Sequence, residues 1–132
     1  ITGRVVGELS IPVIANGDIR TAEQGLRILD ETGAAGLMLG RGAIADPLLF
    51  ERLRKQHPEE PTEAETAAML HHYLKELLRL YSELFCGERQ ILDKVKNVLS
   101  FIDTPAFSKR ITKMKRVHNL ADLAALIEAL KR

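Results

Sequence analysis

Two short apolar segments, each followed directly by a glycine-containing turn, constrain the fold of this chain most. They are residues 11–19 (IPVIANGDI) and residues 36–42 (GLMLGRG). Each has the length and composition of a buried strand, over residues 11–15 and 36–39, and each turn leads into a helix. The sequence therefore predicts two successive strand and helix units, as in a parallel α/β sheet or barrel.

The turns at residues 16–18 and 40–42 predict a phosphate site. Glycine lets a backbone approach a ligand closely, and the turn or helix start after a strand offers unpaired N–H groups to an anion. In a (β/α)8 barrel, the loops after the seventh and eighth strands commonly form one such site. No later segment has the pattern of a strand, so we expect the last two units of a barrel whose earlier strands lie upstream of residue 1. For either motif alone, the simpler interpretation is a plain turn in which Asp18 caps the next helix.

Capping signals place a helix between the two strands. Thr21 and Gln24 have the spacing of a capping box, and Gly33 suits the left-handed residue that ends a helix. We expect a helix over about residues 21–32.

A domain boundary is predicted after a second, shorter helix. The Asp-Pro pair at residues 46–47 has the residues of an N-cap and a first helical position, so a short helix should run to about residue 55. The polar segment 56–61 (QHPEEP), with its two prolines, then reads as a linker. We expect the end of a barrel over residues 1–56 and a helical domain over residues 57–132.

Four amphipathic helices are predicted in the second half. Thr62 begins the first with a capping box and Gly87 ends it, a second follows, Pro105 opens the third and Asn119 opens the fourth. Their short connections favour an antiparallel four-helix bundle, which makes the whole chain mainly helical. The residues predicted to face the core are Ala67, Leu70, Leu74, Leu77, Tyr81, Leu84, Leu92, Val95, Leu99, Ile102, Leu123, Ile127 and Leu130.

The third helix separates cations from apolar residues. At 100° per residue, Phe107, Ile111 and Met114 fall on one side. Lys109, Lys113 and Arg116 fall nearly opposite them. Such a row usually forms a solvated helix face, but it also suits the phosphates of an RNA backbone.

Three segments together resemble one enzyme family. Residues 12–19 (PVIANGDI), 33–43 (GAAGLMLGRGA) and 46–50 (DPLLF) are similar in order and spacing to the tRNA-dihydrouridine synthases, flavin enzymes that reduce uridines in tRNA. Residues 94–99 (KVKNVL) resemble a basic segment of the carboxyl-terminal helical domain of that family. Other FMN barrels carry either glycine turn alone, so the joint pattern is what makes the resemblance specific.

The resemblance implies a cofactor, a substrate and the residues that hold them. The implied cofactor is FMN. Its phosphate is held largely by backbone groups, and Arg41 adds positive charge. The residues that would hold it are Asn16, Gly17, Asp18, Gly40, Arg41 and Gly42. The helical domain binds tRNA, here through Lys94, Lys96, Lys109, Lys113 and Arg116. NADPH reduces FMN, the flavin N5 delivers hydride to uridine C6, and a cysteine acid protonates C5. That cysteine is expected upstream of residue 1, so the stretch should be inactive alone.

A second interpretation keeps the FMN barrel and changes the tail. In it, the barrel belongs to another oxidoreductase with a small-molecule substrate, and the helices are a structural or protein-interaction bundle. Only the first interpretation requires the catalytic cysteine and the uracil-recognising residues elsewhere in the enzyme.

The remaining reactive residues predict no further site. The single cysteine, Cys86, excludes an internal disulfide and is expected to be a partly buried, inert thiol. The adjacent residues His71 and His72 diverge by about 100° on a helix, which is poor geometry for a shared metal, and all four histidines are expected at the surface or at boundaries. Without an apolar stretch long enough to span a bilayer, we expect a cytoplasmic protein, with strand edges of a truncated barrel available for self-association.

Overall fold

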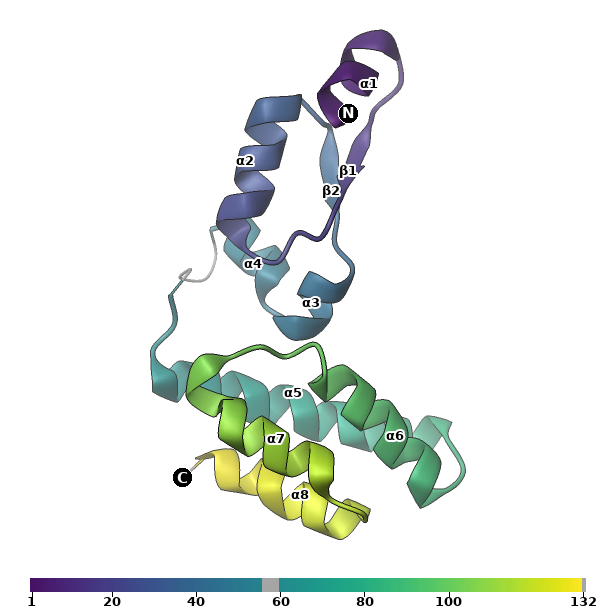
Figure 1. Cartoon of the computed structure of the whole chain (residues 1–132), viewed down its shortest axis with the longest axis vertical. Coiled ribbons are helices and arrows are strands. Elements are labelled where there is room, and N and C mark those ends of the chain that lie inside the picture. Colours follow the sequence, from purple (N-terminus) through teal and green to yellow (C-terminus); the bar gives the residue numbers. More distant parts are fainter. Residues whose placement is uncertain (56–59, 132) are drawn as a thin grey trace. The chain divides into compact units, whose positions relative to one another are not determined.

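The computed structural model describes residues 1–55 and 60–131, which fold as two compact units, Ile1–Glu59 and Glu60–Arg132 (Figure 1). The first unit combines helices with a small parallel sheet, and the second consists of helices. The expected mainly helical chain with two parallel strands is therefore confirmed. Membership of those strands in a barrel stays a prediction, as does the four-helix bundle. Most of the predicted linker at residues 56–61 lies outside the described residues.

Two three-residue strands form the sheet of the first unit. Strand β1 (Ile14–Asn16) pairs in parallel with β2 (Gly36–Met38), with Ile14 opposite Gly36 and Asn16 opposite Met38. The sequence predicted an earlier start for β1, at residue 11. Pro12 has no N–H to donate to a ladder, which accounts for the later start. The register brings the carboxyl ends of both strands to one edge of the sheet.

Helix α2 (Ala22–Thr32) connects the strands and follows its predicted signals. The Thr21 hydroxyl accepts from the Gln24 amide at 3.2 Å, and the Gln24 side chain accepts from the Thr21 amide at 3.3 Å. Gly33 ends the helix with a φ of 65°, in the left-handed region. The predicted capping box and stop are therefore both confirmed.

Three short helices complete the first unit: α1 (Thr2–Glu8), α3 (Arg41–Ala45) and α4 (Leu49–Leu53). Asp46 does not cap α4 as expected. Its carboxylate instead accepts from the Leu48 amide at 3.0 Å and from Arg52 Nε at 2.8 Å. The side chain thus stabilises the turn before the helix, and α4 begins two residues later than the Asp-Pro signal predicts.

One face of the sheet carries little cover within this unit. Ala15 is 3% exposed, whereas Ile14 and Met38 are 55% and 60% exposed. Alternating side chains of a strand point to opposite faces, so these two residues present an apolar surface on the other side. Self-association through such strands stays a prediction.

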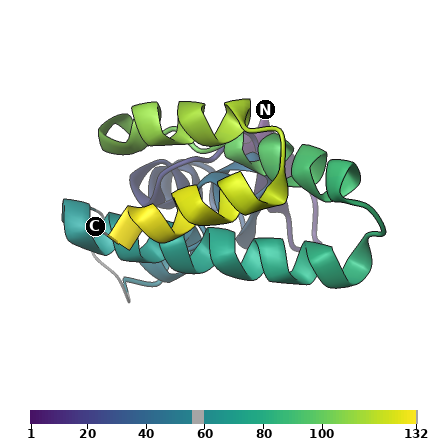
Figure 2. The same ribbon diagram turned by 90° about the horizontal axis from the view of Figure 1, so that it is seen from below.

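The second unit is built from four helices: α5 (Glu63–Leu84), α6 (Glu88–Leu99), α7 (Ser108–Arg116) and α8 (Leu120–Glu128). Short 3-10 turns at Pro105–Phe107 and Ala129–Lys131 precede α7 and follow α8. Helix α8 packs against both α5 and α7, as Figure 2 shows, and α6 packs against α5 and α7. The fully buried residues of their common core include Leu70, Leu74, Val95, Leu99, Met114 and Leu123.

The connection between α5 and α6 differs from the prediction in three residues. Helix α5 ends at Leu84, which is 71% exposed, before Gly87 is reached. Gly87 instead precedes α6 with a φ of 114°. Cys86 is exposed, and the prediction of a partly buried thiol is wrong, because it is the neighbouring Phe85 that packs against the core.

His71 is buried, contrary to the expectation that all four histidines lie at the surface or at boundaries. It is 4% exposed on α5, and its Nε2 donates to Glu128 Oε2 of α8 at 3.1 Å. Lys75 Nζ donates to the other oxygen of Glu128 at 2.8 Å. One carboxylate thus satisfies a buried imidazole and links α8 to α5. His72 and His118 are exposed as expected, and His57 lies outside the described residues.

The Glu128 carboxylate makes the helical unit sensitive to acid. Hydrogen bonds from Lys75 and from His71 lower the pKa of Glu128 from its ordinary 4.5 to about 2. A lowered pKa contributes stability that is present above the unfolded-state value and is lost as the pH falls through the folded-state value. Glu128→Gln should therefore lower the free energy of unfolding at about pH 6, and the difference from the wild type should shrink toward about pH 2.

Urea unfolding followed by circular dichroism at a series of pH values measures this difference. Glu83→Gln is the matched control, since Glu83 pairs with Arg79 of its own helix, α5, on the exposed surface. A Glu128→Gln effect of equal size at all pH values would contradict the assignment.

Candidate functional site

The two glycine turns of the first unit lie at one edge of the sheet. Strand β1 ends at Asn16, and Gly17 and Asp18 follow it directly. Strand β2 ends two residues before Gly40, whose backbone opens α3. Because the strands are parallel neighbours, the turns after them are neighbours as well.

An ion pair joins the two turns. Arg41 Nη2 lies 3.0 Å from Asp18 Oδ1, and Arg20 Nε lies 3.2 Å from the same oxygen. All three side chains are about half exposed. Asp18 therefore does not cap α2, a role that Thr21 fills, and the simpler interpretation of Asp18 as a cap is wrong. Sequence reasoning overlooked Arg20, although its spacing of two residues from Asp18 was a usable signal.

The three glycines of these turns differ in what surrounds them. A Cβ at Gly17 or Gly40 would meet no atom within 4 Å, so both residues face open space. A Cβ at Gly42 would lie only 2.0 Å from the carbonyl oxygen of Ile19. Internal packing thus accounts for Gly42, while Gly17 and Gly40 leave their backbone accessible from outside.

The sheet edge carries the groups that an anion needs. Two guanidinium groups stand against one carboxylate, which leaves one positive charge in excess. The first amides of a helix have no intrahelical acceptor. At the start of α3, Ala43 N–H already donates to the Gly40 carbonyl at 3.1 Å, which leaves the amides of Arg41 and Gly42 as the candidates to bind an anion. These groups and the open backbone at Gly17 and Gly40 fit a phosphate. The described residues of these two turns include no cysteine, and Cys86 belongs to the other unit.

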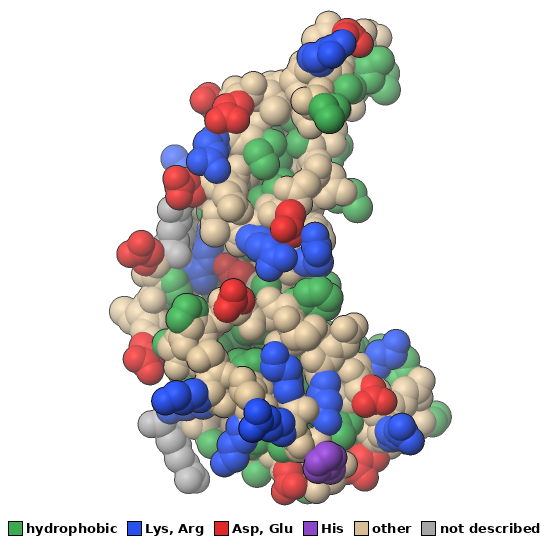
Figure 3. Space-filling model, in the orientation of Figure 1, with side chains coloured by type: hydrophobic (Ala, Val, Ile, Leu, Met, Phe, Trp, Pro, Cys, Tyr) green, Lys and Arg blue, Asp and Glu red, His purple; other side chains and the backbone are tan. Residues whose placement is uncertain are grey.

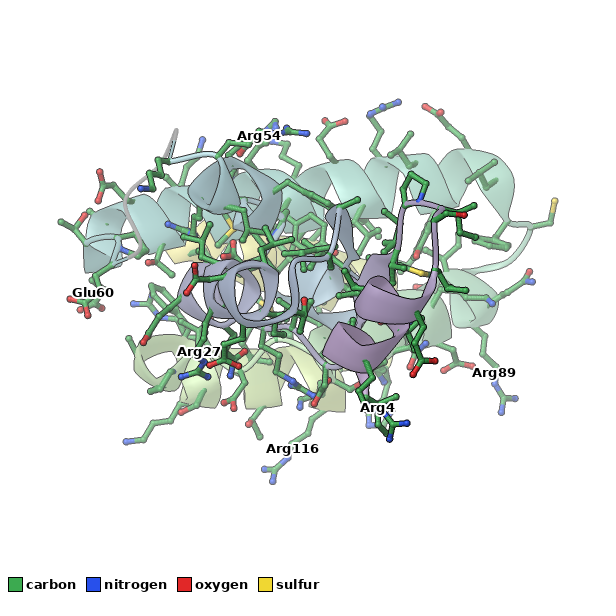
Figure 4. All side chains as sticks on the ribbon, turned by 90° about the horizontal axis from the view of Figure 1, so that it is seen from above. Arg4, Arg27, Arg54, Glu60, Arg89 and Arg116 are labelled. Carbon is green, nitrogen blue, oxygen red and sulfur yellow. The ribbon has the colours of Figure 1, made fainter. Side chains whose placement is uncertain are left out.

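The outward face of α7 is the second candidate site. Phe107, Ile111 and Met114 are at most 3% exposed, which confirms the predicted packed side of the helix. The side chains on the opposite side are exposed: Lys109, Lys113 and Arg116. Lys and Arg side chains gather over α7 in Figure 3, and Arg116 points away from the helix in Figure 4.

The two lysines of the KVKNVL segment lie on α6, apart from the cations of α7. Lys94 is exposed, and its ammonium lies 5.5 Å from the centre of the Phe85 ring, as in a cation–π contact. Lys96 is half-buried. The structure thus leaves Lys94 more available to a ligand than Lys96.

Two other kinds of site find no support in the part of the chain that the structure describes. Among residues 1–55 and 60–131, no group of three His, Cys, Asp or Glu side chains could hold a metal ion. No helix within the same ranges is long and apolar enough to cross a membrane.

Comparison with known proteins identifies relatives over nearly the whole chain. Residues 3–131 match the family model described as dihydrouridine synthase. The chain is 28% identical over 130 residues to the tRNA-dihydrouridine(16) synthase of Cupriavidus necator, covering 96% of this chain and 39% of that protein. It is 34% identical over 130 residues to tRNA-dihydrouridine synthase B of Vibrio vulnificus, covering 93% and 38% respectively. The chain thus spans about two fifths of the length of these relatives.

We expect Gly42→Ala to destabilise the first unit by about 1–3 kcal/mol, because the new methyl group collides with the Ile19 carbonyl and the backbone must move. Amide hydrogen exchange of β1 and α2 reports the stability of this unit separately. Gly17→Ala is the control, since its Cβ meets open space. Equal exchange in the two variants would show that the contact is relieved without cost.

Proposed function

Because the chain belongs to the dihydrouridine synthase family, we propose that it acts within a tRNA-dihydrouridine synthase, which reduces uridine to dihydrouridine in tRNA. One observation carries the proposal: the Asn16–Asp18 and Gly40–Gly42 turns lie at one sheet edge, joined by Asp18 and Arg41. The match runs to residue 131 and so includes the helices, which favours this enzyme over another FMN barrel with an unrelated tail.

In this proposal the first unit holds the phosphate of FMN. The backbone at Gly17, Asp18 and Gly40 approaches the phosphate, and the first amides of α3 donate to it. The guanidinium groups of Arg20 and Arg41 offset its charge, while Asp18 orients them. Bound FMN supplies the hydride for the uracil ring, with NADPH as the reductant.

The chain supplies binding groups rather than the catalytic acid. Its single cysteine, Cys86, lies on the connection between α5 and α6 in the helical unit, and not in the turns that follow the strands. We therefore assign the acid to a residue outside these 132 residues and expect them to be inactive alone. Residues 1–56 contribute to the FMN domain in this scheme, and residues 57–132 form the domain that binds tRNA.

The helical unit binds the tRNA backbone in this proposal. Packing of Phe107, Ile111 and Met114 fixes the orientation of α7 and turns its cations outward. Each cation that neutralises a phosphate releases counterions, so binding through this face depends on salt. The residues proposed to contact tRNA are Lys109, Lys113 and Arg116, with Lys94 and Lys96 from α6.

We predict that Gly17→Asp combined with Gly40→Asp abolishes FMN retention by the full-length enzyme that contains these residues. Each substitution places an anion where backbone should meet phosphate. Flavin absorbance of the purified protein measures retention. The control is Gly7→Asp, which adds one such carboxylate at an open position on α1. A folded double variant with stoichiometric flavin would rule out the phosphate assignment.

The triple variant Lys109→Ala, Lys113→Ala and Arg116→Ala tests the tRNA surface. Loss of up to three phosphate contacts should flatten the plot of log affinity against log salt by roughly 2 to 3 units, from about 0.7–0.9 per contact. Helicity should not change, because none of the three side chains packs in the core. Titration with tRNA at several salt concentrations measures the slope, and an unchanged slope in the folded variant would make α7 an ordinary solvated face.

A further inference from the structure

The outward face of α7 carries a shallow, open hollow, and two hydroxyl groups line it beside the cations. The hollow has a volume of about 350 Å³, and its lining residues are Ser108, Lys109, Thr112, Lys113 and Arg116. The three cations are already part of the proposed tRNA surface. Ser108 and Thr112 have no role in that proposal.

Both hydroxyls are available to a ligand. Within residues 1–55 and 60–131, neither Ser108 nor Thr112 makes a side-chain hydrogen bond to another residue. Serine and threonine on a helix often bond back to the carbonyl of the preceding turn, as Ser82 Oγ does to Leu78 at 2.8 Å. Ser108 and Thr112 lack that bond, so their donors and lone pairs are unused.

The helix places these hydroxyls and the cations on adjacent strips of one face. Ser108 and Thr112 are four residues apart, as are Lys109 and Lys113, so each pair forms a row along the axis. Arg116 lies one further turn beyond Thr112. At 1.5 Å per residue the face extends about 12 Å along the helix.

The chemistry of the hollow selects an anion with several oxygen acceptors. Helix α7 (SKRITKMKR) contains no acidic residue, and none lines the hollow. Lys and Arg donate only, and a hydroxyl can donate as well. Phosphate oxygens of nucleic acids are commonly contacted by Arg and Lys together with Ser and Thr hydroxyls.

We propose that this hollow holds a phosphodiester of the tRNA backbone, with the Ser108 and Thr112 hydroxyls donating to phosphate oxygens that Lys109, Lys113 and Arg116 neutralise. The inference rests on the proposed function, because it takes tRNA as the ligand of α7. In this inference, uncharged hydroxyl groups add to the affinity for tRNA. Because removing them changes no charge, an experiment can separate hydrogen bonding from charge neutralisation.

The decisive comparison uses two double variants of the full chain. Ser108→Ala with Thr112→Val removes both hydroxyls while keeping similar shapes, whereas Ser108→Thr with Thr112→Ser exchanges the residues and keeps both hydroxyls. Fluorescence anisotropy with labelled tRNA, at several salt concentrations, gives the affinity and its salt slope for each. Circular dichroism confirms that both remain helical.

We expect the variant without hydroxyls to bind tRNA about five- to a hundredfold more weakly, from two lost hydrogen bonds, with the salt slope of the wild type. The exchanged variant should bind within about twofold of the wild type, since it keeps both donors. Wild-type affinity of the variant without hydroxyls would overturn the inference. Equal weakening of both variants would overturn it as well, because shape rather than hydroxyl donors would then be responsible.

The outcomes distinguish this inference from the proposal that the cations of α7 bind tRNA. If the triple cation variant keeps its salt slope, the tRNA surface itself is wrong. If that slope flattens while the variant without hydroxyls binds normally, only the hydroxyl contacts are wrong. Inorganic phosphate and polyglutamate serve as competitors at matched ionic strength, and hydroxyl-dependent binding of either one as tight as that of tRNA would overturn the assignment to an RNA phosphodiester.

Discussion

The parallel pairing of Ile14–Asn16 with Gly36–Met38 fixes the position of every polar group at the sheet edge. Each strand contributes three residues, and the register places the turn after β1 beside the turn after β2. Gly42 allows close packing here, because without a side chain the backbone of α3 can approach the carbonyl oxygen of Ile19. The ion pair between Asp18 and Arg41 can form only where the backbone has already brought the turns together. The ion pair of the site therefore depends on the packing of the backbone.

Short-range signals predicted most of the secondary structure. The capping boxes at Thr21 and Thr62 and the N-cap at Asn119 are formed as the sequence indicates, because each depends on residues three positions apart. The apolar stripe of α7 was equally predictable from helical periodicity. The role of Asp46 was harder to predict. Its carboxylate can either cap a helix or accept hydrogen bonds from a turn amide and from Arg52, and the fold determines which of these it does.

Pairings between distant residues could not be predicted in the same way. Burial of His71 follows from its contact with Glu128, 57 positions away, and helical periodicity alone does not reveal such a partner. The exposure of Cys86 depends on the last turn of α5, where Leu84 extends beyond the core. At the sheet edge, the glycine turns identified two segments that the structure brings together, but the sequence did not distinguish the packing role of Gly42 from the open positions of Gly17 and Gly40.

The position of Asp18 has a consequence for how tightly the sheet edge can hold an anion. Arginine side chains lose considerable rotamer freedom when they are fixed, and that loss weakens binding if it occurs when the ligand arrives. Here one carboxylate already restrains Arg20 and Arg41, so part of the loss occurs on folding instead. The restraint is incomplete, because all three side chains are about half exposed and salt screens their attraction. For an anion bound there as proposed, Asp18 would therefore act through preorganisation: it lowers the net positive charge of the edge and restrains the two arginine side chains.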